Sequence, residues 1–144
     1  MSLSFILPRR PVSGQKRPNP LFKEAVRQAA RLRGASVSGS EPLYARIVWL
    51  HSAKRDQDVD NIVKPILDAL NGVAYEDDHQ VAQCQAAAFR VSTDLEISRA
   101  NVDTKTHDEF RSLLSRNPDH VLYVEIGPAT TSRVVLGPLD GGAP

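Results

Sequence analysis

Two groups of acidic side chains lie close together in this sequence, with only one short helical pattern between them. They are the aspartates of residues 56–60 and the acids of residues 76–78. Carboxylates gathered in this way repel one another, and removing them from water is costly unless a cation neutralises them. Hard divalent ions such as Mg²⁺ prefer oxygen ligands and commonly serve phosphate chemistry. The pattern therefore favours a metal-dependent phosphodiester hydrolase.

Length and composition fit a single soluble domain. At 144 residues the chain can bury one core but not two independent ones. Its apolar runs are far shorter than the roughly 20 residues that span a bilayer, so no membrane partner is expected. A single cysteine, Cys84, excludes an internal disulfide and a thiolate zinc site. We expect a cytoplasmic protein.

Charge is distributed unevenly along the chain. Residues 1–55 hold 11 Lys or Arg and two acids, a net charge of +9, whereas residues 56–144 hold seven and 15, a net charge of −8. A basic half that contacts a polyanion, with acids gathered around a metal, would produce this asymmetry. A solvated basic helix face beside an acidic surface is the alternative that charge alone leaves open.

Hydrophobic periodicity predicts four strands and three helices. The strands are expected at residues 3–7, 43–51, 81–91 and 121–126, and the helices at 20–33, 60–70 and 103–116. Because Pro65 cannot donate to the carbonyl of Asn61, the second helix is expected to begin late or to bend there. The order of elements predicts a small α+β domain, with a mixed sheet of four or five strands packed against helices. It would span residues 1–127, followed by a flexible tail at 128–144 that is rich in glycine and proline.

The first acidic group lies at the start of the second predicted helix. Asp58 and Asp60 are two residues apart, which in an extended segment puts both side chains on one side, where both can approach one ion. Lys64 follows Asp60 by four residues, so both can share a helix face. The alternative is that Asp60 caps the helix and that Lys64 forms ordinary ion pairs with Asp60 and Asp68. Spacing alone leaves both open.

Two other metal sites are excluded by their ligand spacing. Asp56, Asp58 and Asp60 match the opening of an EF-hand calcium loop, but that loop needs Gly at its sixth position and Glu at its twelfth. Those positions hold Asn61 and Leu67. The histidines are scattered, without the spacing of zinc ligands. The second acidic group, residues 76–78, has two interpretations. It can be a solvated turn, or the intervening helix can bring its carboxylates beside those of the first group at one end of the sheet.

These residues together resemble the RusA-like Holliday-junction resolvases, which are crossover-junction endodeoxyribonucleases. The similarity rests on Asp58-x-Asp60-Asn61-x-x-Lys64-x-x-Leu67-Asp68-Ala69-Leu70-Asn71-Gly72, followed by Asp77-Asp78-x-Gln80-Val81. Members of that family form homodimers, bind four-way DNA junctions and cut them symmetrically with Mg²⁺ or Mn²⁺. The resemblance implies the same activity here, in DNA recombination and repair, and a homodimer as the working form.

The resemblance also implies roles for individual side chains. Asp58, Asp60 and Asp78 would be the catalytic carboxylates and metal ligands, with Asp77 as a further metal ligand, and Lys64 the essential basic residue. Lys64 would stabilise negative charge on the reacting phosphate.

Basic side chains in the N-terminal half are candidates for contact with DNA phosphates. Four of them lie in a proline-rich loop: Arg9, Arg10, Lys16 and Arg17. Arg27, Arg31 and Arg33 of the first predicted helix can also reach phosphates, or can form a solvated face. A different class of protein is the alternative to the nuclease: a non-catalytic DNA-binding or assembly module that keeps the acidic group as a structural cap.

Overall fold

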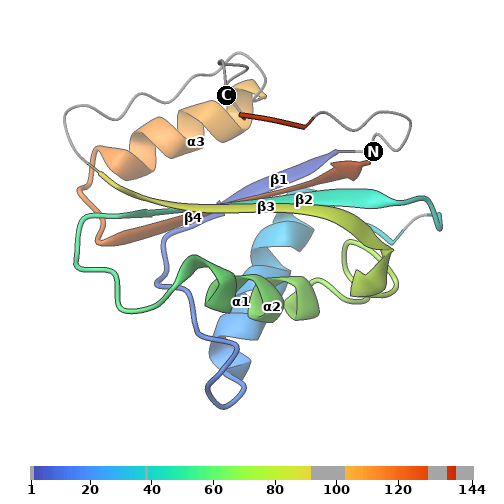
Figure 1. Cartoon of the computed structure of the whole chain (residues 1–144). Helices are drawn as coiled ribbons and strands as arrows, with labels where there is room; N and C mark the ends of the chain where they lie inside the picture. The colour runs from blue at the N-terminus through green and yellow to red at the C-terminus, as the bar shows by residue number, and fades with distance from the viewer. Residues whose placement is uncertain (1, 38, 92–102, 130–135, 139–144) are drawn as a thin grey trace.

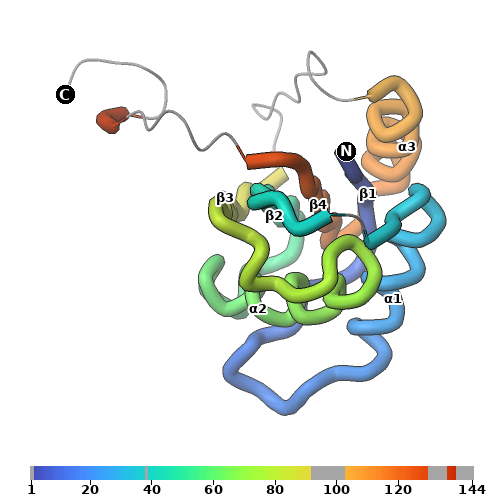
Figure 2. The backbone as a smooth tube through the Cα atoms, turned by 90° about the vertical axis from the view of Figure 1, so that its right-hand side faces the viewer, coloured from blue at the N-terminus to red at the C-terminus, as the bar shows by residue number. Residues whose placement is uncertain are grey.

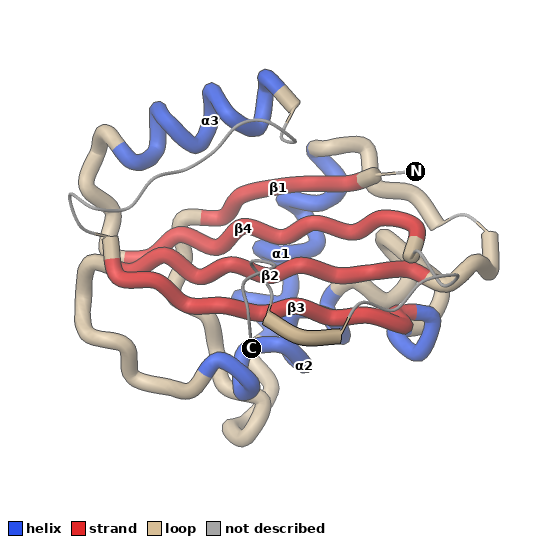
Figure 3. Tube along the Cα trace, turned by 45° about the horizontal axis from the view of Figure 1, so that its top comes forward, coloured by secondary structure: helices blue, strands red, loops and turns tan. Residues whose placement is uncertain are grey.

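Four strands form one mixed sheet in the order β1-β4-β2-β3. The computed structural model describes residues 2–37, 39–91, 103–129 and 136–138. The strands are β1 (Leu3–Leu7), β2 (Leu43–His51), β3 (Val81–Arg90) and β4 (His120–Pro128). β4 lies between β1 and β2 (Figure 3) and pairs antiparallel with both, whereas β2 and β3 run parallel. This architecture confirms the predicted α+β domain with a mixed sheet.

Helices cover both faces of the sheet. α1 (Pro20–Leu32) and α2 (Val59–Ala69) lie on one face, and α3 (Thr104–Leu114) lies on the other (Figures 1 and 2). Parallel neighbours need a crossover connection, and α2 supplies it between β2 and β3. A short 3₁₀ helix, η1 (Asp78–Gln80), leads directly into β3.

The main core lies between the sheet and the α1–α2 layer. Alternate residues of β2 enter it, namely Ala45, Ile47 and Trp49, and each is at most 1% exposed. Ile62 and Ile66 of α2 are fully buried against them, because positions four apart share one helix face. A smaller apolar cluster under α3 consists of Ile6, Leu50, Phe110, Val121 and Tyr123.

The predicted elements match the observed ones to within a few residues, with one correction at α2. This helix begins at Val59, with Asp58 at its N-cap and Pro65 inside it. Of the two consequences expected of Pro65, a late start or a bend, the late start is therefore wrong. Most of the expected tail at 128–144 lies outside the described residues. Within the described ranges, no helix has the length and apolar character needed to cross a membrane.

Candidate active site along helix α2

The N-terminal end of α2 presents two exposed carboxylates. Asp58 occupies the N-cap position, yet its side chain makes no capping hydrogen bond, and Asp60 follows in the first turn. Across the described part of the chain, neither forms an ion pair. The idea that Asp60 caps the helix is therefore wrong. Both carboxylates lie where the helix dipole favours negative charge.

Lys64 lies one turn further along α2 and pairs with Asp68. Its Nζ is 3.2 Å from Asp68 Oδ1, and its side chain is 74% exposed. The hydrogen bond with Asp68, and then the negative charge of that carboxylate, raise the pKa of Lys64; Asp78 adds a smaller effect. Lys64 is therefore a protonated cation on an accessible helix face. An exposed pair of this kind is weak, so the ammonium group can exchange partners readily.

The second acidic group gathers at the C-terminal end of α2. Burial first, and then a hydrogen bond with Asp68 and its negative charge, raise the pKa of Asp78. Asp77 Oδ1 accepts a 2.9 Å hydrogen bond from the backbone N–H of His79 and lies 2.9 Å from its Nδ1. These contacts lower the pKa of Asp77, the backbone bond most. The structure thus brings Asp68, Asp77 and Asp78 together with Lys64.

Tyr75 binds the C-terminal end of α2 from the interior of the protein. Its ring is fully buried, and its hydroxyl donates a 2.6 Å hydrogen bond to the carbonyl of Leu67. Burial raises the pKa of Tyr75, and the negative charges of Asp78 and Asp68 raise it further. The neutral phenol therefore fixes the last turn of α2 beside the carboxylates.

The two acidic groups do not meet. Asp60 and Asp68 are eight residues apart, which corresponds to about 12 Å along a helix axis. Asp78 lies with Asp68, so Asp58 and Asp60 are at the opposite end of α2 from it. Among the described residues, no three His, Cys, Asp or Glu side chains form a group that could hold one metal ion. Asp58 and Asp60 lie at one end of α2, and Asp68, Asp77 and Asp78 lie at the other, with Lys64 between the two groups.

A polar cavity of about 410 Å³ opens beside the N-terminal end of α2. Its walls come from the basic loop (residues 8–19) and from the segment that leads into the helix. The lining residues are Ser13, Gln15, Lys16, Arg55, Asp56, Gln57, Asp58 and Asn61. Lys16 therefore shares a cavity with Asp58. Arg55 was not among the predicted site residues, although it stands only three residues before Asp58.

Comparison with protein families identifies the chain. The sequence model of the endodeoxyribonuclease RusA family matches residues 16–99, which is more than half of the chain and includes both acidic groups, Lys64 and Lys16. The chain belongs to the RusA endodeoxyribonuclease family. Among curated proteins no match is found. The resemblance inferred from the spacing of acids and lysine is confirmed, and it indicates a hydrolase of DNA.

The arginines of this RusA-family chain that were predicted to contact DNA fall into two groups, those still available for DNA and those held by structural contacts. Arg17 is exposed in the basic loop, Arg10 pairs with Asp56 at 3.2 Å, and Arg9 lines a separate cavity of about 490 Å³ beside α1. All three remain candidates for contact with DNA. Arg27 is committed elsewhere, because it donates hydrogen bonds to the carbonyls of Ala69 (3.0 Å) and Asn71 (2.9 Å) at the end of α2.

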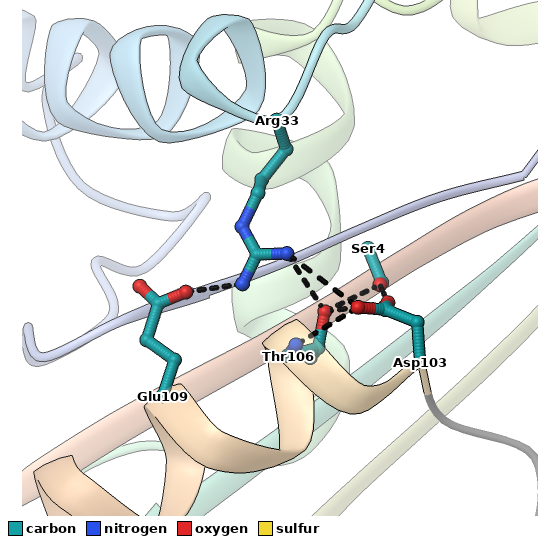
Figure 4. Close-up of polar contacts among 5 residues, drawn as sticks. All are labelled: Ser4, Arg33, Asp103, Thr106 and Glu109. Atoms are coloured by element: carbon teal, nitrogen blue, oxygen red, sulfur yellow. Dashed lines mark hydrogen bonds and ion pairs between the residues drawn. The ribbon is translucent and has the colours of Figure 1, made fainter.

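Arg33 is also committed to a structural contact. From the end of α1 it reaches past β1 to α3, on the other face of the sheet (Figure 4). It donates to Thr106 Oγ1 at 3.0 Å and to the carboxylate of Glu109, and it lies 3.8 Å from Asp103. Arg27 and Arg33 therefore have structural partners, which neither the phosphate interpretation nor the solvated-face interpretation predicted. Arg31 stays exposed, with Glu24 3.5 Å away.

Proposed function

We propose that this RusA-family chain is a Mg²⁺-dependent endodeoxyribonuclease that resolves four-way DNA junctions in recombination and repair. The observation that carries the proposal is the start of α2. Asp58 stands at the N-cap without capping the helix, and Asp60 follows it, so two neighbouring carboxylates face solvent without a cation from the described residues. In a family of DNA hydrolases, such a pair is best explained as a metal site.

The donor set fits Mg²⁺. This ion keeps several of its waters and usually binds through one or two carboxylates plus the phosphates of its substrate. Asp58 and Asp60 form such a pair, and Asp77 and Asp78 form another at the far end of α2. Mn²⁺ accepts the same oxygen ligands. When bound, the ion would activate water and neutralise charge on the scissile phosphate.

Lys64 supplies the positive charge between the two pairs. Its raised pKa keeps it protonated, and its partner Asp68 is itself 44% exposed, so the pair holds the ammonium group only loosely. A phosphate entering along α2 would offer Lys64 a second anionic partner. An ammonium held in place beforehand stabilises the negative charge that develops during hydrolysis. Asn61, next to Asp60, would support the carboxylates through its side-chain amide when a metal ion is bound.

The basic loop carries DNA affinity in this proposal. Lys16 lies in the cavity with Asp58, and Arg9, Arg10 and Arg17 lie along the same loop. Contacts of such side chains with phosphates position a duplex without reading its sequence. A two-fold homodimer in the cytoplasm would present two copies of the site to the two-fold arms of a junction, which accounts for symmetric cleavage.

The alternative of a non-catalytic module makes a different demand on the same residues. It requires the acidic group to act as a structural cap. Asp77 does cap η1, through the N–H of His79, but the side chain of Asp58, at the capping position of α2, makes no such bond. For the first acidic group, the missing bond favours the enzyme.

Asp60→Asn tests the proposal, because the change keeps the shape of the side chain and removes its charge. We expect single-turnover cleavage of a four-way junction in Mg²⁺ to fall by orders of magnitude, with junction binding retained or tightened. Asp108→Asn, the same change at an exposed position of α3, is the matched control and should cleave like wild type. Cleavage by Asp60→Asn at the wild-type rate would remove Asp60 from the site.

A further inference from the structure

A proline inside α2 leaves one helix carbonyl without its usual partner. In an α-helix the N–H of residue 65 would donate to the carbonyl of residue 61, but Pro65 has no N–H. The carbonyl of Asn61 instead accepts a 2.7 Å hydrogen bond from the backbone N–H of Gly14. A group that an ordinary helix uses internally therefore joins α2 to the basic loop.

The loop backbone rests directly on the helix at this point. A β-carbon added at Gly14 would lie 3.4 Å from the Asn61 oxygen, 3.4 Å from Pro65 Cδ and 3.7 Å from Lys64 Cβ. These are contact distances, so a methyl group at Gly14 would touch both Pro65 and the Asn61 carbonyl, and a larger side chain would crowd them. The proline ring is thus part of the surface on which the loop lies.

A tight turn on this surface sets the direction of Lys16. Ser13 is only 8% exposed. Its Oγ accepts a hydrogen bond from the N–H of Gln15 (3.1 Å), and its carbonyl accepts one from the N–H of Lys16 (3.2 Å). Ser13, Gln15, Lys16 and Asn61 all line the polar cavity. Fixing Gly14 on α2 therefore fixes the turn that carries Lys16 into that cavity.

Two other contacts attach the loop to the segment before α2. Gln57 Nε2 donates to the carbonyl of Pro11 at 2.5 Å, and Arg10 pairs with Asp56 at 3.2 Å. Both lie on the N-terminal side of Gly14. The hydrogen bond to Asn61 is the contact nearest to Lys16 and is made to α2 itself.

We infer that Pro65 is a positioning residue for DNA binding: by leaving the carbonyl of Asn61 open to Gly14, it fixes the basic loop so that Lys16 and Asp58 face the same DNA strand. This inference rests on the proposed function, because it gives the loop a role only if the loop contacts DNA. It assigns to the proline a part in binding that neither charge nor metal-ligand chemistry would suggest.

Pro65→Ala tests the inference by supplying an N–H that competes for the Asn61 carbonyl. Exchange of the Gly14 amide with deuterium should become about tenfold faster, and four-way junction DNA should bind about threefold to tenfold more weakly, the factor expected for one net hydrogen bond. The melting temperature should not fall, since alanine favours a helix interior over proline. Pro20→Ala is the matched control. At the first position of α1 a missing N–H has no helical partner to lose, so both readouts should stay at wild-type values.

A second variant approaches the same contact from the loop. Gly14→Val places methyl groups against Pro65 and the Asn61 carbonyl without altering α2, and it should weaken DNA binding to a similar degree. It also covers the case in which Pro65→Ala does not fold. Unchanged DNA affinity in Gly14→Val would overturn the inference.

Lys16→Ala separates failure of the inference from failure of the proposed function. If Lys16→Ala weakens DNA binding but Pro65→Ala changes neither amide exchange nor affinity, the positioning role is wrong and the function stands. Faster exchange without loss of affinity overturns the positioning role as well. If Pro65→Ala speeds exchange while Lys16→Ala binds DNA normally, Lys16 is not a DNA contact and the positioning role fails. The proposed nuclease function is then judged separately, by whether wild type cleaves a four-way junction in Mg²⁺ and Asp60→Asn does not.

Discussion

Arg33, at the end of α1, holds α3 in place from the opposite face of the sheet. Replacing Arg33 should lower the free energy of unfolding and change nothing else. Arg33→Met keeps most of the aliphatic stem and removes the guanidinium. That group donates to Thr106 and to Glu109, with its side chain only 11% exposed. A hydrogen bond to a charged group contributes about 1.5–3 kcal/mol. The carboxylates of Glu109 and Asp103 are 48% and 55% exposed, so screening reduces the total to about 2 kcal/mol.

Urea and thermal unfolding, followed by the fluorescence of Trp49, measure this loss. Trp49 is the chain's single tryptophan and is fully buried in the main core. For a domain of this size, about 2 kcal/mol corresponds to about 4–8 °C in melting temperature. Arg31→Met is the matched control, because Arg31 is 52% exposed and pairs with Glu24 at the surface. It should cost no more than about 0.5 kcal/mol. If Arg33→Met is as mild as the control, apolar packing alone holds α3 in place.

Three further predictions concern Lys64, the basic loop and the acid limb of stability. Lys64→Arg keeps the positive charge but broadens the head group and moves it outward, so single-turnover junction cleavage should fall by about 10²-fold or more, with the melting temperature unchanged. Full activity in both Lys64→Arg and Lys64→Ala would rule out a catalytic role for Lys64. Replacing all four basic residues of the loop with Ala should reduce the slope of log affinity against log salt by about one unit per lost phosphate contact, and an unchanged slope would leave the loop as solvated surface. Hydrogen bonds from the side chain and then the backbone of Thr106 lower the pKa of Asp103 in the folded protein. Ionised Asp103 therefore stabilises the fold fully above its unfolded pKa of about 4, and this stabilisation is lost as pH falls through the lower folded value. Urea unfolding below about pH 4 should show a smaller loss of stability in Asp103→Asn than in wild type, and equal losses would refute this.

The fold followed from local patterns because each element carries its own signal. Alternation of apolar residues along β2 marks the face that packs on α1 and α2, and Ile62 and Ile66 repeat at helical spacing on α2. These patterns are read within one element and do not depend on distant partners. The strand and helix positions were therefore predictable to within a few residues.

The roles of the arginines were not predictable, because their partners lie far away in sequence. Arg27 caps carbonyls 42 and 44 residues later, and Arg33 reaches Glu109 after 76 residues. On the sequence alone both look like Arg31, a cation on a polar helix face. Only the packing of α1 against α2 and the position of α3 distinguish them.

The sequence named candidate site residues, but not their arrangement in space. The acids and lysine of the motif all lie on or beside α2, yet the length of the helix separates Asp60 from Asp78. The proline rule correctly identified a missing hydrogen bond at Pro65. It did not predict that Gly14, 47 residues before Asn61, supplies a donor from the basic loop. The expected late start of the helix was wrong.

Cleavage of a four-way DNA junction by the wild-type chain, with Mg²⁺ titrated against EDTA, is the decisive test of the proposed function. We expect symmetric cuts that require Mg²⁺ or Mn²⁺ and stop when EDTA is in excess, while the junction remains bound throughout. Binding without cleavage at saturating Mg²⁺ would show a DNA-binding module instead. Cleavage that persists in excess EDTA would contradict the role given to Asp58 and Asp60.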